Sequence, residues 1–395
     1  MNIRIIKNAH NLKGNVYSGR FILEKEFEPS GYEGINLVRY YLYDVEKNQK
    51  TELLSDRKKY DILKIKNLDK KNNMLYFTSI SEEPSEKKDI TLYRYDINNN
   101  KLNVIYKYND DIGQYSEYKR IRVFILNEIY IIIQNEYIRY NLTESFKGYF
   151  EFEQYLYCIK DNRIIAITDD NLRTNGIETI KLLKNNMCVI KTGYNLMTDE
   201  RYKNLSKNEA AYERVSFVNI GQLVSDILLM KKNIVLDTID QAYYTETFAY
   251  VAVKGNYIVY SKVNPGENEE EVIFYNYETK ESMLCINKNI YGIEDLAMSY
   301  IIGNTPYIRL ASQTGTQFYN LIKNTVDIKF PENVTVETVV NDMFIVSGRK
   351  KHFIGRDTPA VTVYRYPDKE LLHQEKGIYM GCIAADRENI YILTV

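Results

Sequence analysis

Hydrophobic and polar residues alternate along most of this chain, in short stretches separated by polar turns. The stretch ITLYRYDINNNKLNVIYKY, residues 90–108, alternates, breaks at a run of asparagines and then alternates again. Alternation with a period of two is typical of a β-strand with one buried face, and an Asn-rich break between two such strands is typical of a turn. The pattern therefore predicts a β-hairpin.

The same hairpin pattern recurs along the sequence. Clear copies begin at Ile35, Ile90, Glu271 and Val361, and weaker copies begin at Glu136, Gly176 and Thr316. The copies at Glu271, Thr316 and Val361 are spaced by 45 residues. Further alternating segments precede most copies, such as residues 74–80, 127–134 and 256–263. Four short strands that repeat at this interval are typical of a β-propeller blade.

We therefore predict an all-β fold, a single β-propeller of four-stranded antiparallel blades that spans residues 1–395. Seven hairpins favour seven blades, and the additional strands at both ends of the chain allow eight. We expect the N- and C-terminal strands to close the propeller in one shared blade, which would protect the strand edges. A pair of β-sandwiches would not repeat at 45 residues, and a β-helix would show a shorter, glycine-rich period.

The repeats resemble those of prokaryotic propellers of the TolB and quinoprotein-like kind. This resemblance covers nearly the whole chain, but the strand pattern alone carries it, so it implies a fold and no activity. The sequence lacks the Trp-Asp dipeptide of one large propeller family and the paired glycines of kelch repeats. Since the chain contains no Trp, it also lacks the Ser-x-Asp-x-Gly-x-Thr-Trp box of sialidases.

The repeat is interrupted between Gly176 and Glu271, where the interval is about twice the usual length. We predict that residues 195–241 form an insertion with an amphipathic helix, the alternative being a degenerate blade. Ser206 and Glu209 fit a capping box. An apolar stripe at helical spacing follows, formed by Ile220, Leu223, Val224, Ile227 and Leu228. This stripe is a candidate interaction surface, or it packs on the outside of its own propeller.

Composition excludes several classes of protein. The net charge of −1 gives no general attraction to nucleic acid or to anionic membranes. The N-terminus lacks the apolar core of a secretory signal, and no apolar run is long enough to span a bilayer. The four cysteines, at 158, 188, 285 and 382, have no CxxC spacing, so we predict reduced core thiols. These features predict a cytoplasmic protein with no nucleic-acid or membrane partner.

The loops expected on one face of the propeller are long and varied, which favours that face for function. One of them, GRKKHFIGRD, carries Arg349, Lys350, Lys351, His352 and Arg356. Such a basic loop would suit an acidic ligand or partner, although it would equally balance acidic loops nearby. The acidic loops lack the spacing of a calcium site, so we predict no metal site and no cofactor.

Catalytic motifs are absent from the sequence. The chain has only three histidines, and no GxSxG, HExxH, Walker or GxGxxG motif occurs in a suitable context. The catalytic residues are therefore unknown at this stage. We predict a non-catalytic module that binds a protein or a carbohydrate, and that is not an enzyme. The alternative is a hydrolase or lyase acting on a sugar or a small ester through acidic residues or a divalent metal. A third possibility is a purely structural subunit.

Overall fold

A computed structural model represents the whole chain of 395 residues. It describes the following residues: 2–7, 21–29, 36–44, 47, 49–53, 61–69, 71–81, 89–109, 116–140, 148–193, 213–243, 246–264, 269–287, 299–312, 315–340, 342–350, 357–384 and 389–395. Contacts within the chain group it into two compact units, residues 61–290 and residues 1–60 together with 291–395.

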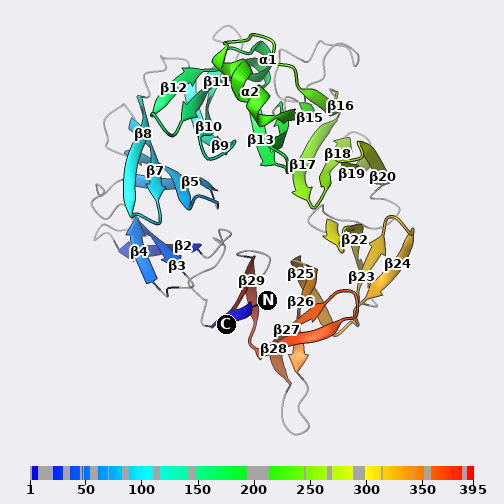
Figure 1. Ribbon diagram of the computed structural model, residues 1–395. Coiled ribbons are helices and arrows are strands. Elements are labelled where there is room, and N and C mark those ends of the chain that lie inside the picture. Colours follow the sequence, from blue (N-terminus) through cyan, green and yellow to red (C-terminus); the bar gives the residue numbers. More distant parts are fainter. Residues whose placement is uncertain are drawn as a thin grey trace. The chain divides into compact units, whose positions relative to one another are not determined.

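The unit of residues 61–290 contains four sheets of four antiparallel strands, each in sequential order (Figure 1). The first two sheets consist of β5 (Asp61–Asp69), β6 (Met74–Ser81), β7 (Asp89–Asp96) and β8 (Lys101–Asn109), and of β9 (Ser116–Ile125), β10 (Tyr130–Tyr140), β11 (Gly148–Cys158) and β12 (Arg163–Ala166). The other two consist of β13 (Ile177–Leu182), β14 (Met187–Thr192), β15 (Glu213–Asn219) and β16 (Asp237–Ala242), and of β17 (Thr247–Lys254), β18 (Tyr257–Asn264), β19 (Glu269–Asn276) and β20 (Glu281–Asn287). Two helices, α1 (Asp170–Asn175) and α2 (Ile220–Leu228), belong to this unit.

The other unit also contains four sheets. One is formed by β2 (Phe21–Pro29), β3 (Asn36–Asp44) and β4 (Gln49–Leu53), and another by β21 (Ser299–Ile302), β22 (Thr305–Ser312), β23 (Gly315–Asn320) and β24 (Thr325–Lys329). The third has β25 (Val334–Val340), β26 (Met343–Lys350), β27 (Thr358–Arg365) and β28 (Glu370–Lys376). In the last, β1 (Asn2–Ile6) pairs in parallel with β30 (Asn389–Thr394), which pairs with β29 (Tyr379–Ala384).

These eight sheets confirm the predicted fold class, an all-β propeller, with the larger of the two blade counts that the sequence allows. The ends of the chain share one sheet, as expected. Two of the weak hairpin copies do not lie where the pattern placed them. The copy at Glu136 begins within β10, the second strand of its blade, and the copy at Gly176 covers the inner pair β13 and β14. The outer pairs of those two blades are β11 with β12 and β15 with β16.

The turns explain why Tyr-Asp recurs at strand ends. The carboxylate of Asp96 accepts hydrogen bonds from the backbone N–H groups of Asn98 and Asn99, both at 3.0 Å. Asp69 does the same in its own turn, and so closes a tight turn without glycine. Asn100 then adopts a left-handed conformation with φ of 50°, which asparagine tolerates better than most residues. Turn formation is therefore encoded locally.

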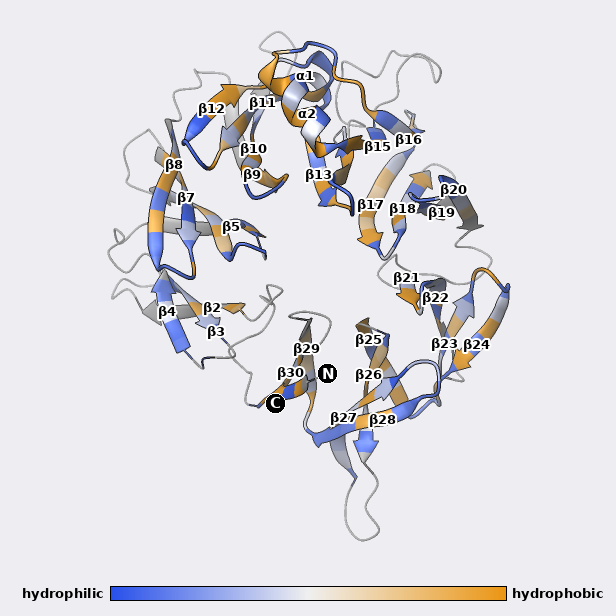
Figure 2. Cartoon of the chain, viewed as in Figure 1, coloured by the Kyte–Doolittle hydropathy of each residue, from blue (hydrophilic) through white to orange (hydrophobic). Residues whose placement is uncertain are grey.

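The apolar faces of neighbouring sheets pack against each other. In the unit of residues 61–290, one cluster fills the interface between the sheets β5–β8 and β9–β12, and two more fill the next two interfaces. In the other unit, an aromatic cluster joins the sheets β21–β24 and β25–β28. Figure 2 shows the mixture of apolar and polar residues along the strands that this packing requires. Within each unit, neighbouring sheets therefore bury their facing sides against each other.

The range predicted as an insertion or degenerate blade, residues 195–241, contains β15, α2 and most of β16. β15 and β16 are strands of the four-stranded sheet β13–β16, and α2 connects them. Asn219 caps α2, because its side chain accepts a hydrogen bond from the N–H of Gln222. The predicted cap residues Ser206 and Glu209 lie outside the described residues.

Replacing Lys254 with methionine is expected to stabilise the protein at neutral pH. Burial at the end of β17 lowers the pKa of Lys254 to about 8 from an ordinary value of 10.5. Between pH 8 and pH 10.5 the unfolded chain binds more protons than the folded chain, so the free energy of unfolding rises with pH. The full free-energy cost of burying the charged Lys254 is therefore present below pH 8. We expect a gain of about 2 kcal/mol at pH 7 that shrinks as the pH rises through 8.

Urea unfolding followed by circular dichroism at several pH values would measure this gain. Lys181→Met is the matched control, because Lys181 is exposed on β13. An equal effect of the two substitutions, or a gain that does not change with pH, would contradict the assignment.

Candidate functional site

The basic loop singled out from the sequence lies almost entirely outside the described residues. Arg349 is exposed near the end of β26, and Lys350 is the last residue of that strand. Lys351, His352 and Arg356 are not among the described residues. This candidate therefore stays a prediction.

The apolar stripe of α2 lies in the core. Ile220, Leu223, Val224 and Ile227 are at most 6% exposed and belong to the cluster between the sheets β9–β12 and β13–β16. Only Leu228, at 38%, reaches the surface. Four of these five side chains are consequently packed against the protein's own sheets and are not presented to a partner.

A polar residue recurs at one position of the second strand of a blade. The fifth residue of that strand is polar in the six four-stranded sheets: Thr78, Gln134, Lys191, Ser261, Arg309 and Ser347. In the unit of residues 61–290 all four of these residues are buried. Burial of a polar side chain is costly unless it is hydrogen-bonded. Gln134, Lys191 and Ser347 make polar contacts from this position, and Lys191 brings a full charge there.

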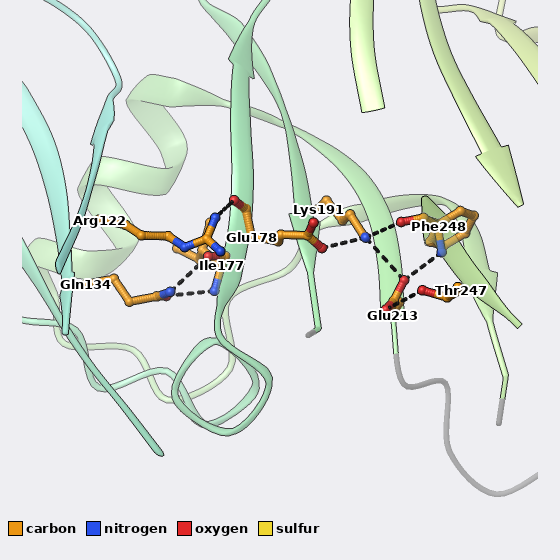
Figure 3. A network of polar contacts seen from close by, with 8 residues as sticks. All are labelled: Arg122, Gln134, Ile177, Glu178, Lys191, Glu213, Thr247 and Phe248. Atoms are coloured by element: carbon orange, nitrogen blue, oxygen red, sulfur yellow. Dashed lines mark hydrogen bonds and ion pairs between the residues drawn. The ribbon is translucent and has the colours of Figure 1, made fainter. Parts of the chain in front are cut away.

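Lys191 lies at the centre of a network of polar contacts (Figure 3). Its side chain is 4% exposed. The ammonium lies 2.5 Å from Oε2 of Glu178 and 3.3 Å from Oε2 of Glu213, and it also donates to the backbone carbonyl of Phe248. Two carboxylates from the neighbouring strands β13 and β15 thus share one buried cation.

Glu213 is the inner carboxylate of this cluster, with a side chain that is 2% exposed. It accepts hydrogen bonds from the Thr247 hydroxyl at 2.9 Å and from the Phe248 N–H at 2.7 Å. Burial raises the pKa of Glu213, and the charge of Lys191 opposes that rise. Glu213 therefore ties β15 to the start of β17 in the next sheet.

Glu178 is the outer carboxylate, and a β-bulge places it. The pairing of β13 with β14 shifts register between Ile177 and Thr179, so Glu178 is the extra residue. Its side chain is 33% exposed, in contrast to the other two charged groups of the cluster. Bulges re-aim a side chain and are frequent beside active sites. Here the bulge directs a solvent-accessible carboxylate onto a buried ammonium.

Side chains of the preceding sheet hold the backbone of this bulge. Gln134 donates to the Ile177 carbonyl at 2.9 Å and accepts from the Ile177 N–H at 2.7 Å. Arg122 donates to the carbonyl of Glu178 at 2.7 Å and pairs with the buried Glu136 at 2.6 Å. In Figure 3 these contacts lead from the sheet β9–β12 to Glu178 and on to Phe248 of β17. The position of Glu178 is thus fixed from both sides.

A second ion-pair group lies in the interface between the sheets β13–β16 and β17–β20. Lys262 lies 3.5 Å from Oδ1 of Asp240 and 3.3 Å from Oε2 of Glu246. Tyr260 joins the two groups, since its hydroxyl donates to Asp240 at 3.2 Å and its ring packs edge-on against Phe248. Lys262 of β18 therefore pairs with a carboxylate of β16 and with Glu246, the residue just before β17.

The unit that holds residues 1–60 and 291–395 repeats the bulge arrangement. Glu337 is the extra residue where β25 pairs with β26, and it accepts a hydrogen bond from Ser347, the fifth residue of β26. In both units, therefore, the glutamate at the bulge contacts the polar fifth residue of the second strand: Glu178 contacts Lys191, and Glu337 contacts Ser347. Neither Glu178 nor Glu337 was predicted from the sequence, although Lys191, a charged residue in the strand MCVIKT of β14, was an available signal.

Within the described ranges, no three or more His, Cys, Asp or Glu residues are arranged to hold a metal ion. In the same part of the chain, no helix has the length and apolar character needed to cross a membrane.

Several solved structures are similar to this chain, but no family is shown. No protein-family model matches the chain, and no curated protein matches it. An oligogalacturonate lyase from Vibrio parahaemolyticus is 12% identical with a TM-score of 0.44, and the match covers 91% of this chain and 90% of that one. The β-propeller domain of the trilobed protease from Pyrococcus furiosus is 8% identical, with coverage of 91% and 92% and a TM-score of 0.45.

Another similar structure is dipeptidyl peptidase 4 from Porphyromonas gingivalis. It is 10% identical with a TM-score of 0.48, and the match covers 90% of this chain and 51% of that one. At these identities the likeness concerns the propeller fold alone.

One expectation from the sequence is corrected by these comparisons. The sequence favours a non-catalytic interaction module, whereas the similar solved structures named above belong to a lyase and to peptidases. The physical reason for the error is that propeller sites assemble from separate blades and leave no local motif. The interaction module is therefore withdrawn.

Proposed function

We propose that this chain is a propeller enzyme, a hydrolase or lyase that acts on a sugar or a small ester, and that Glu178 is its proton-transferring carboxylate. The observation that carries the proposal is the contact between a solvent-accessible carboxylate and a buried ammonium, 2.5 Å apart. A positioned carboxylate can take a proton from a substrate or from an attacking water molecule. Lys191 holds that carboxylate in one orientation.

The groups around Glu178 support this role. Glu213 is almost fully buried and anchors Lys191 from the inner side, so the cation remains beside Glu178. The bulge of β13 and the hydrogen bonds from Gln134 and Arg122 fix the backbone. A proton-transferring group must be held within hydrogen-bond reach of its substrate, and such support provides this precision.

An activity screen with a single substitution tests the proposal. The panel consists of nitrophenyl glycosides, nitrophenyl esters and oligosaccharides of uronic acids, each assayed with and without added Mg²⁺ or Mn²⁺. Glu178→Gln removes the carboxylate and keeps the size of the side chain. We expect kcat/KM to fall by roughly 10²-fold, since general acid–base groups typically contribute at least that much.

Glu278→Gln is the matched control, because Glu278 is an exposed carboxylate in the turn after β19. It is expected to leave activity unchanged, and circular dichroism would show that both variants are folded. Absence of turnover on the whole panel, or full activity of Glu178→Gln, would refute the proposed function.

A further inference from the structure

A buried amide on the other face of β10 has no hydrogen-bond partner. The Asn135 side chain is 0% exposed, and neither its Nδ2 nor its Oδ1 atom is hydrogen-bonded. Asn135 lies between Gln134 and Glu136 along β10. The side chains of these two residues lie on the opposite face of the strand and are hydrogen-bonded or ion-paired. Because buried polar groups are almost always satisfied, an amide with both atoms unpaired indicates a missing partner.

The residues next to Asn135 form an aromatic and acidic cluster. Glu153 of β11 lies directly opposite Asn135, so both side chains occupy the same face of the sheet. Oε2 of Glu153 accepts hydrogen bonds from the hydroxyls of Tyr137, at 2.8 Å, and Tyr155, at 3.2 Å. Glu153 is exposed to solvent. The Tyr137–Glu153 hydrogen bond thus crosses the face of the sheet diagonally beside Asn135.

Aromatic surface adjoins this cluster. The rings of Tyr155 and Tyr106, the latter from β8 of the neighbouring sheet, lie 5.9 Å apart and are both half-buried. Burial, followed by the charge of Glu153, raises the pKa of Tyr155, so its hydroxyl stays protonated as a donor. The face therefore offers an apolar ring surface beside hydrogen-bonding groups.

The charges select the chemical class of the missing partner. A cation would suit Glu153 but not the amide N–H groups of Asn135, and an anion would be repelled by Glu153. A hydroxyl group both donates and accepts, so it can satisfy Nδ2 and Oδ1 of one amide. A ligand with several neutral hydroxyls and an apolar ring face meets all of these requirements.

We propose that the part of this face around Asn135 and Glu153, next to the apolar cluster shared with the sheet β5–β8, binds a saccharide through Asn135, Glu153 and the Tyr155 ring. Asn135 has no exposed surface, so a ligand must open a path to it. We expect the exposed Glu153 side chain to rotate away from the two tyrosine hydroxyls when the ligand enters. A sugar hydroxyl then pairs with the Asn135 amide while Glu153 accepts from another hydroxyl. This site is separate from Glu178 and does not depend on the proposed enzyme activity.

Binding of defined sugars to the full chain tests this proposal. The probes are glucose, galactose, N-acetylglucosamine, cellobiose and lactose, with glycerol as a non-sugar polyol, and binding is measured by saturation-transfer NMR and calorimetry. The chain contains no Trp, so near-UV circular dichroism reports its tyrosines and should change on binding. We expect at least one sugar to bind, and Asn135→Leu and Glu153→Ala each to weaken binding by at least ten-fold.

Two control variants make the outcome specific. Glu128→Ala and Glu278→Gln each remove an exposed carboxylate from a turn; both should bind the sugar like the wild type. If no sugar binds and Asn135→Leu raises the melting temperature, the amide is only an unsatisfied core group and the proposal is overturned. Binding that survives Asn135→Leu and Glu153→Ala would also overturn it. Loss of activity in Glu178→Gln has no bearing on this result.

Discussion

Replacement of Lys191 by methionine is expected to lower the free energy of unfolding by about 3–5 kcal/mol. This range is typical when one partner of a buried ion pair is removed and the other charge remains buried. Methionine keeps the length and much of the apolar contact of the lysine stem. The loss therefore arises mainly from Glu213, which stays 2% exposed without its cation.

The pKa of Glu213 determines how the loss of stability depends on pH. Burial already raises the pKa of Glu213, and removing Lys191 takes away the charge that opposes the rise. The folded variant then holds a proton that the unfolded chain releases above its ordinary pKa of 4.5. Stability of the variant should consequently fall as the pH rises through this window, so the loss is smaller in mild acid than at pH 8.

Urea unfolding at several pH values would measure both effects. The double variant Lys191→Met with Glu213→Gln should recover most of the loss, because no buried charge remains unpaired. Lys262→Met is the matched control, since its partners are partly exposed and its loss should be much smaller. A loss for Lys191→Met that is independent of pH, or no recovery in the double variant, would refute this explanation.

The fold could be predicted from the sequence because its signals are local. Strand alternation and Asx turns such as that of Asp96 lie within a few residues of each other. The clear repeats therefore revealed the blade. The weak copies at Glu136 and Gly176 were misplaced. The first two strands of a blade, such as β13 and β14, show the same alternation of apolar and polar residues as its last two strands. The alternation of apolar and polar residues alone does not show which two strands of a blade a hairpin forms.

The site could not be predicted because its three charged residues lie on three strands of one sheet and their supporting residues lie on the two neighbouring sheets. Glu178, Lys191 and Glu213 are separated along the chain by a turn and by residues 194–212, and their meeting depends on a bulge that leaves no sequence motif. The stripe of α2 shows the same limit. Its spacing predicts a helix with one apolar face, but the spacing does not show whether this face packs on the protein's own core or on a partner.

Gly315→Ala is expected to destabilise the protein by roughly 2–5 kcal/mol, through backbone strain and overpacking together. Gly315 begins β23 with a φ of +107°, a conformation that residues with a side chain rarely adopt. A Cβ atom there would press against the carbonyl oxygen of Phe330 and lie 2.8 Å from the carbonyl carbon of Pro331. Both of these are backbone atoms, so no side-chain rotation relieves the clash.

The clash also disturbs neighbouring contacts, because Phe330 is held by other interactions. Its N–H donates to the carbonyl of Thr316 at 2.8 Å, and its ring lies 5.0 Å from that of Phe344 in the aromatic cluster between two sheets. Gly221→Ala is the control: Gly221 lies in the first turn of α2 without a positive φ, and the atom nearest to an added Cβ, at 3.2 Å, is the side-chain oxygen of Asn219, which can shift by a few tenths of an ångström. Urea unfolding of both variants should show a large loss for Gly315→Ala and little change or a gain for Gly221→Ala. Equal stability of Gly315→Ala and the wild type would mean that β23 does not begin in this backbone conformation.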